Sequence, residues 1–264
     1  MAVLKAALGS FFIHYKDLSL YLNNTEIHMK LKNIFFLCLL FSCFGFSWPF
    51  LSGANNTTNS YTSTSSSGWV NRETQILISQ ARNFDSHVLR LALTAYKNAQ
   101  KKGYTHKRLL TVIDYSKPSS QKRMLVVDLN RNRVLFNTFV SHGKNSGALN
   151  ATSFSNNPGS LKSSIGVFVT DQTYQGKNGY SLRLRGLEKG INDSAYSRAI
   201  VIHGAPYANP ANIGRNGRLG LSWGCPAVEP TLAKPIINTI KQGSVVFAYS
   251  PDRRWLSHSS FLSA

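Results

Sequence analysis

The chain has 264 residues, of which 42% are apolar and 16% are charged, a composition that excludes disorder driven by excess charge. Its length allows one large domain or two small ones, and the absence of a purely apolar run of 20 residues argues against a polytopic membrane protein. With 30 Lys and Arg against 11 Asp and Glu, the net charge of +19 favours binding to polyanions without a dedicated site.

Residues 1–54 are typical of a targeting segment rather than of a folded domain. Lys30 and Lys32 precede an apolar run over 34–46, and small residues follow at 52–54. A basic start, an apolar centre and a small-residue end are the three parts of a secretory signal peptide. We therefore expect an exported protein that acts in the periplasm or cell envelope.

Met29 is the expected start of this signal peptide, which would cover 29–54 and leave residues 1–28 as an upstream extension. Two alternatives stay open. The apolar run can be extended to Leu51 and would then serve as an uncleaved membrane anchor. The residues before Cys43 also resemble a lipoprotein cleavage site.

Cys225 is the only cysteine outside the targeting segment, because Cys38 and Cys43 both lie within it. The remaining chain, from residue 55 on, keeps a net charge of +17 and cannot form a disulfide scaffold. A lone thiol is either a buried, inert hydrophobic group or a nucleophile. Export exposes a thiol to oxidation, and this favours the nucleophile.

The exported part begins with polar and helical segments. Residues 55–70 are expected to form a linker, because nearly all residues over 55–68 are Asn, Ser or Thr. Apolar residues then recur at intervals of three and four, which predicts a helical segment over 71–104 that packs on the domain. Asp85 is a candidate cap for a second helix, and Gly103 is a candidate end.

Runs of β-branched and aromatic residues predict a mainly β domain over 105–252. A helix is expected at 229–242, and residues 253–264 are expected to form a C-terminal tail. We predict a mostly antiparallel sandwich or barrel with short helices and an N-terminal helical segment. The expected strands cover 109–116, 124–130, 134–142, 165–170, 180–186, 198–203 and 244–250.

Two long segments between the strands, 143–164 and 204–224, are rich in Gly, Ser and Asn. Loops of this length in a compact domain usually carry function. The second loop begins after His203, at the end of an expected strand, and ends at Cys225. An imidazole can accept the thiol proton, and Gly224 permits a tight turn whose N–H groups can face an oxyanion. The order His before Cys argues against papain-like and NlpC-type peptidases, which place Cys first.

These residues resemble the catalytic domain of the YkuD-like L,D-transpeptidases, whose pattern is a strand ending in His-Gly and a later Ser/Thr-His-Gly-Cys. The chain has His203-Gly204, then Ser222, Gly224 and Cys225. The segment SSIGVFVT at 163–170 is similar to the family's upstream segment. Further stretches resemble a murein L,D-transpeptidase-like subgroup, namely VVDL (126–129), SHGKNSG (141–147), SLRLRGLEKG (181–190), NDSAYSR (192–198) and HGAPY (203–207).

The resemblance implies roles for individual residues. Cys225 is the nucleophile, and His203 is the base, with a preformed thiolate–imidazolium pair as an open option. The Gly204 carbonyl or a nearby hydroxyl orients the imidazole. The N–H groups of Trp223, Gly224 and Cys225 form the oxyanion hole. Trp223 stands where the family usually has His, and Ala227 where Arg or Asn often follows. Candidate substrate-binding residues are Ser222, His142, Tyr207, Arg218 and Arg215.

The resemblance also implies acyl transfer on peptidoglycan stem peptides, with release of D-alanine and formation of a 3→3 crosslink. If water is the acceptor, the same residues form an L,D-carboxypeptidase. A non-catalytic peptidoglycan-binding module is the alternative from another class. No metal or organic cofactor is implied, and a zinc peptidase built on His142 and His203 is the minor alternative.

The expected partners are stem peptides and, through charge, anionic polymers of the cell envelope. No specific nucleic-acid binding is expected. Contact with the membrane is expected only if the N-terminal segment stays uncleaved. We expect a monomer.

Overall fold

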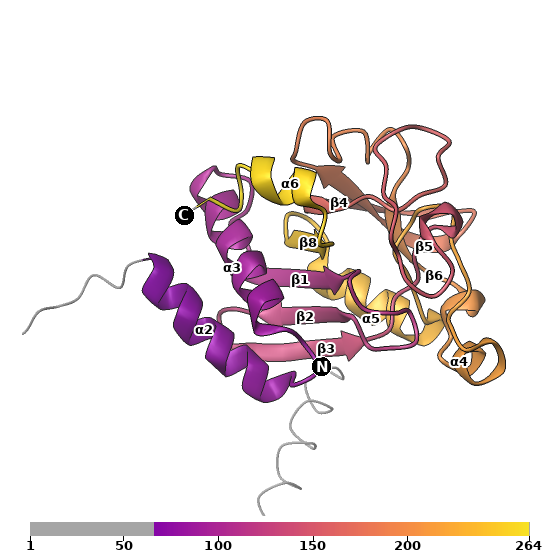
Figure 1. The fold of residues 1–264 in the computed structure, drawn as a ribbon, viewed down its shortest axis with the longest axis horizontal. Coiled ribbons are helices and arrows are strands. Elements are labelled where there is room, and N and C mark those ends of the chain that lie inside the picture. The colour runs from indigo at the N-terminus through magenta and orange to yellow at the C-terminus, as the bar shows by residue number, and fades with distance from the viewer. Residues whose placement is uncertain (1–65, 264) are drawn as a thin grey trace, which may run out of the picture. The chain divides into compact units, whose positions relative to one another are not determined.

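A computed structural model describes residues 66–263, whose arrangement is shown in Figure 1. The expected targeting segment over 1–54 and most of the expected linker lie outside these residues. Among the helices of the described part, none is both long and apolar enough to cross a membrane.

A single mixed sheet of eight strands organises the described residues, in the order β3-β2-β1-β8-β4-β5-β6-β7. Five of its pairings are antiparallel, and β1–β8 and β6–β7 are parallel. The mainly β fold is therefore confirmed, with parallel pairs that the strand pattern did not reveal. The strands are β1 Leu109–Asp114, β2 Met124–Asp128, β3 Arg133–Thr138, β4 Gly166–Gly176, β5 Gly179–Gly186, β6 Val201–Gly204, β7 Ala227–Val228 and β8 Val245–Tyr249.

The two edges of this sheet approach each other, so that it curls towards a barrel. After β3 the chain continues along β7, where the Ser141 N–H donates to the Ala227 carbonyl at 2.8 Å. One step further, Gly143 forms a parallel bridge with Ser222. Closure removes unpaired strand edges and brings the loop after β3 beside the segment before β7.

The centre of the sheet is buried on both faces. Every residue of β2 and β8 is buried, although neighbouring side chains in a strand point to opposite faces. Helix α3 (Ser86–Lys101) contacts β1 and β8, and α2 (Ser66–Gln80) contacts β3 (Figure 1). Helix α5 (Pro230–Ile240) packs against β1, β5 and β6.

The N-terminal helices follow the sequence signals closely. Asp85 caps α3 by accepting a hydrogen bond from the His87 N–H at 2.7 Å. Gly103 follows the end of α3 with φ of +78°, a conformation that glycine adopts without strain. The start of α2 differs from expectation, because this helix begins at Ser66, inside the stretch expected to be linker.

The C-terminal residues also differ from expectation, since they form a packed helix rather than a tail. Helix α6 (Arg253–His258) buries Trp255, and Phe261 is buried after it. The buried Glu188 carboxylate accepts hydrogen bonds from the Trp255 Nε1–H at 3.0 Å, from the Ser259 hydroxyl and from the Val167 N–H at 2.7 Å. One carboxylate thereby joins α6 to β4. The remaining short helices are α4 (Ala211–Asn216), η1 (Lys144–Ser146) and η2 (Pro206–Ala208).

Replacing Glu188 by Ala is expected to lower the free energy of unfolding by about 2–4 kcal/mol, because three buried donors lose their acceptor. Equilibrium urea denaturation monitored by tryptophan fluorescence measures the change. Glu229→Ala is the matched control, because this partly exposed carboxylate between β7 and α5 makes no capping hydrogen bond, and it should change the stability by less than about 0.5 kcal/mol. Equal effects of the two substitutions would contradict this role for Glu188.

Candidate active site

The parallel pairing of β6 and β7 brings His203 and Cys225 together. His203 lies opposite Ala227 in this pairing, and Cys225 precedes Ala227 by two residues. The Cys225 thiol donates to the Ala199 carbonyl at 3.5 Å, just before β6 begins. His203, at the end of β6, and Cys225, just before β7, line the same cavity.

The turn that carries the thiol is built around the Ser222 hydroxyl. This hydroxyl donates to the Cys225 carbonyl at 2.6 Å and accepts from the Gly224 N–H at 3.1 Å. Gly224 has φ of +124°, and a Cβ there would come within 2.8 Å of the Lys162 carbonyl oxygen. Only glycine fits this turn. Since its N–H is bonded to Ser222, the expected oxyanion donors that have no acceptor among the described residues are the N–H groups of Trp223 and Cys225.

The His203 imidazole is oriented by its own backbone neighbour. Its Nδ1 lies 3.0 Å from the Gly204 carbonyl, which can only accept, so Nδ1 carries the proton. Nε2 is then the basic nitrogen, and the Tyr207 hydroxyl lies 3.5 Å from it. Tyr207 packs edge-on against the imidazole. Nε2 therefore carries the lone pair, and its ring lines the same cavity as Cys225.

A cavity of about 240 Å³ lies over these groups. His203 is almost fully buried in its wall, Cys225 is half-buried, and Trp223 is 71% exposed at its edge. The lining contains no Asp or Glu, and its single full positive charge is that of a lysine. The lining residues are Lys177, Asn178, His203, Tyr207, Leu221, Ser222, Trp223 and Cys225.

Burial keeps both catalytic candidates neutral. It raises the pKa of the Cys225 thiol above its usual value, although the Val201 N–H and the Arg198 charge act in the opposite direction. Burial also lowers the pKa of His203, against the effect of its hydrogen bond to Gly204. The resting state is therefore a thiol beside a neutral imidazole, not a preformed thiolate–imidazolium pair. Burial raises the pKa of Tyr207 to about 12, so that its hydroxyl stays protonated.

Arg198, whose charge acts on the Cys225 thiol, holds the loop over residues 162–164. Its guanidinium donates to the Ser164 hydroxyl at 2.6 Å and to the Lys162 carbonyl at 2.8 Å. From the same loop, the Ser163 hydroxyl donates to the Gly224 carbonyl at 3.2 Å. The partly buried Arg198 thus holds the loop that supports the turn over residues 222–225.

His142, a candidate substrate-binding residue, lies inside the protein instead. It is fully buried, its Nδ1 accepts from the Arg123 guanidinium at 2.7 Å, and its Nε2 donates to the Gly147 carbonyl at 3.0 Å. Both ring nitrogens are therefore occupied, and the ring does not line the cavity. Burial and the neighbouring Arg123 charge lower the pKa of His142 to about 4.

The other candidate substrate-binding residues divide into two groups. Ser222 and Tyr207 line the cavity, but the Ser222 hydroxyl is used within the turn. Arg215 is exposed on α4, and Arg218 donates to the Leu219 carbonyl at 2.8 Å. Neither arginine is among the residues that line the cavity.

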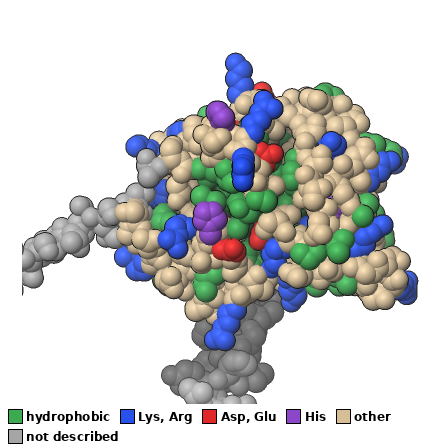
Figure 2. Space-filling view, viewed as in Figure 1, with side chains coloured by type: hydrophobic (Ala, Val, Ile, Leu, Met, Phe, Trp, Pro, Cys, Tyr) green, Lys and Arg blue, Asp and Glu red, His purple; other side chains and the backbone are tan. Residues whose placement is uncertain are grey.

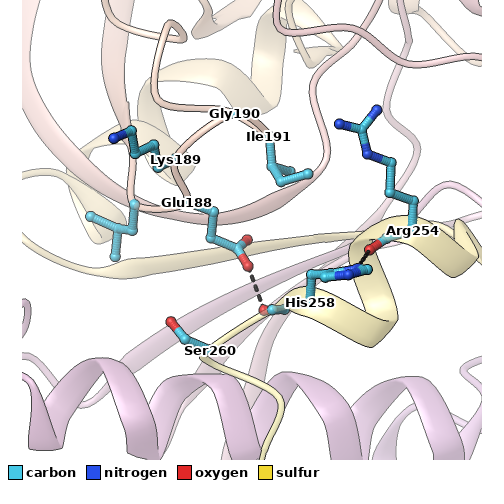
Figure 3. Close-up of a pocket in the computed structure, with 9 residues that line it drawn as sticks. Glu188, Lys189, Gly190, Ile191, Arg254, His258 and Ser260 are labelled. Atoms are coloured by element: carbon cyan, nitrogen blue, oxygen red, sulfur yellow. Dashed lines mark hydrogen bonds between the residues drawn. The ribbon is translucent and has the colours of Figure 1, made fainter.

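A larger cavity of about 550 Å³ lies between α6 and the turn after β5 and contains a serine, a histidine and a glutamate (Figure 3). Their hydrogen bonds do not form a catalytic triad. The Ser259 hydroxyl donates directly to Glu188, and the His258 Nδ1 faces the Arg254 carbonyl of its own helix at 2.8 Å. This cavity therefore lacks an activated nucleophile. Among the described residues, no group of three or more His, Cys, Asp or Glu side chains is placed to hold a metal ion.

A sequence model of the L,D-transpeptidase catalytic domain matches residues 80–249. The chain belongs to this family. A search of curated proteins found no match. The L,D-transpeptidase domain matched here includes all the groups that form the smaller cavity.

Solved structures with similarity to the chain include an L,D-transpeptidase from Mycobacterium smegmatis, with 16% identity, a TM-score of 0.35, and coverage of 54% of this chain and 59% of that one. L,D-transpeptidase 3 from Mycobacterium tuberculosis has 16% identity and a TM-score of 0.35, with coverage of 54% of this chain and 61% of that one. A mutant Enterococcus faecium L,D-transpeptidase has 14% identity and a TM-score of 0.32, with coverage of 54% of this chain and 50% of that one. The chain thus spans less than two thirds of the length of these proteins.

Sequence reasoning missed Lys177, Asn178 and Arg198. The Asn178-Gly179 pair signals a tight hairpin turn and could have joined β4 to β5, although the observed two-residue loop is Lys177-Asn178, one residue earlier. No local signal shows that this hairpin reaches the thiol. Arg198 gives no signal of its own in the sequence, because nothing in its neighbours reveals that it is partly buried.

Alkylation of Cys225 by iodoacetamide is expected to accelerate about tenfold per pH unit from pH 6 to 8, because the thiolate fraction rises that way when the thiol pKa is elevated. Stopped samples analysed by intact mass give the rates. Arg198→Gln removes a charge that lowers this pKa and should slow the reaction further. A rate that is already constant below pH 7 would contradict the neutral pair.

Acidification is expected to destabilise the fold through His142. Its pKa is about 4 in the folded chain and near 6.5 when unfolded, so the unfolded chain binds more protons as the pH falls from 6.5 towards 4. The loss should approach about 3 kcal/mol at pH 4 and be much smaller in His142→Gln. Urea denaturation from pH 7 to 4 measures it, with the exposed His87→Gln as control. Parallel curves for wild type and His142→Gln would contradict this role.

Proposed function

We propose that this chain is an exported cysteine acyltransferase that acts on peptidoglycan stem peptides. The observation that carries the proposal is one small cavity lined by both Cys225 and His203, whose Nε2 is the basic nitrogen, within an L,D-transpeptidase catalytic domain. A thiol beside an oriented imidazole is the arrangement used for covalent acyl transfer.

In the first step the Cys225 proton passes to the His203 Nε2 as sulfur attacks the carbonyl carbon of the third stem residue. The new oxyanion is stabilised by the Trp223 and Cys225 N–H groups, and losing one such donor typically costs about 3–4 kcal/mol. The C–N bond to D-alanine then breaks, and its nitrogen takes the proton from His203. The product is a thioester at Cys225.

In the second step an amine of another stem attacks the thioester and gives a proton to His203. The C–S bond breaks, an amide forms as a 3→3 crosslink, and the Cys225 sulfur recovers its proton. If water attacks instead, the product is a trimmed stem with a free carboxylate. Because the resting pair is neutral, proton transfer accompanies the attack rather than preceding it.

The charge of the protein suits an anionic polymer. On the face in Figure 2, Lys and Arg side chains are spread around the periphery, and Asp and Glu are few. Such a surface attracts anionic cell-envelope polymers without regard to their sequence, and salt weakens the attraction.

Incubation of the full chain with a disaccharide-tetrapeptide is expected to give a thioester adduct with release of D-alanine. Cys225→Ala should form no adduct, and His203→Gln should form it at least about 100-fold more slowly, since it lacks the base. Intact mass and chromatography of the products measure both. Ser257→Ala, at an exposed serine on α6, is a matched control that should behave as wild type. Adduct formation in Cys225→Ala, or none in a folded wild type, would overturn the proposal.

A further inference from the structure

Trp223 is the most exposed large hydrophobic side chain of the described residues, at 71%, where the next is 45%. It lies in the turn between Ser222 and Cys225, whose hydrogen bonds to the Ser222 hydroxyl keep the backbone in place. The indole therefore cannot withdraw from water through a shift of the turn. An aromatic side chain fixed at a cavity edge is a ready contact for a ligand.

Two ammonium groups converge on this indole from different segments. The Lys177 Nζ lies 5.9 Å from the ring centroid, and the Lys144 Nζ lies 6.0 Å from it. Lys177 occupies the tip of the β4–β5 hairpin, and the Lys144 backbone N–H donates to the Ser222 carbonyl at 2.8 Å. The Lys144 backbone is thus bonded to the turn that carries Cys225, and the β4–β5 hairpin brings Lys177 to the same indole.

No carboxylate of the described residues balances these two charges. The ion pairs in residues 66–263 are Arg131–Asp128 and Arg185–Asp171, and the cavity lining holds neither Asp nor Glu. Two like charges near one ring repel each other, while each gains only about 0.5–1 kcal/mol from an exposed aromatic face. An anionic group of a ligand would satisfy both ammoniums at once.

We propose that Trp223, Lys144 and Lys177 form a carboxylate clamp at the mouth of the cavity. The clamp selects acyl donors that carry a free carboxylate close to the reacting carbonyl, in preference to donors in which that group is amidated. The indole packs on the ligand while the ammoniums bind its carboxylate. The inference rests on the proposed function. It replaces Arg215 and Arg218 as the cations that meet the stem, because the cations found against the Trp223 ring are Lys144 and Lys177.

Paired donors test the clamp directly, namely a disaccharide-tetrapeptide with free carboxylates and the same compound with those carboxylates amidated. In the full chain, Lys144→Gln/Lys177→Gln is expected to raise the KM for the free-carboxylate donor about tenfold and leave kcat within about twofold. The KM for the amidated donor should stay unchanged. Lys144→Arg/Lys177→Arg keeps the charges and should keep the preference.

The matched control is Lys189→Gln/Lys234→Gln, which removes two exposed charges away from this cavity. If this control raises the KM equally, the effect is one of total charge and the clamp is wrong. The clamp is also wrong if Lys144→Gln/Lys177→Gln affects both donors alike.

Binding to Cys225→Ala, measured by calorimetry with the same two donors, separates the clamp from the chemistry. Preference for the free-carboxylate donor without turnover by wild type would support the clamp and overturn the acyl transfer. Turnover of both donors at equal KM would support the acyl transfer and overturn the clamp.

Discussion

The position of the Cys225 thiol depends on how closely two glycine-containing segments approach where the sheet edges meet. A Cβ on Gly143 would come within 2.9 Å of the Gly224 Cα, so the loop after β3 can lie against the turn that carries Cys225 only without a side chain there. Hydrogen bonds then fix the contact: the Ser222 N–H donates to the His142 carbonyl at 2.9 Å, and the Gly143 N–H donates to the Ser163 hydroxyl. The same contact closes the sheet and sets the thiol beside His203.

Behind this contact, a buried cation is stabilised almost entirely by dipoles. The Arg123 guanidinium donates to the Val140 carbonyl at 2.9 and 3.1 Å, to the Lys117 carbonyl at 2.8 Å, and to the His142 imidazole. Burial lowers its pKa to about 10, which still leaves the group charged at neutral pH. This charge forces His142 to remain neutral and to present a lone pair. The imidazole therefore links Arg123 to the loop at Gly147 through its two ring nitrogens. This explains why His142 does not line the cavity of the site.

How far the sequence predicts this molecule depends on the range of the interactions involved. Asp85 and Gly103 act on neighbouring residues only, and α3 starts after Asp85 and ends before Gly103, as the sequence indicates. The strands of β1, β2 and β8 follow from local composition, but the parallel pairing of β1 with β8 joins residues 135 apart and leaves no local pattern. The same holds for the site. The family motif indicates His203 and Cys225. Lys177, by contrast, reaches the cavity only because the β4–β5 hairpin is long enough, and the burial of His142 depends on its hydrogen bond with Arg123.

The protonation state of Cys225 depends on where the cations lie rather than on the total charge of the protein. The chain carries +19, yet the cavity lining has one lysine. The Arg198 guanidinium, whose charge acts on the thiol, donates its hydrogen bonds to carbonyl and hydroxyl acceptors of a loop. A more exposed cation at the thiol would favour the thiolate at rest, and a thiolate is open to oxidation. Burial of Cys225 and His203 favours the protonated thiol beside a neutral imidazole. In the proposed reaction the thiol then stays protonated until a carbonyl carbon is in place to accept the sulfur's electrons. The cations at the rim can then attract an anionic ligand without ionising the nucleophile beforehand.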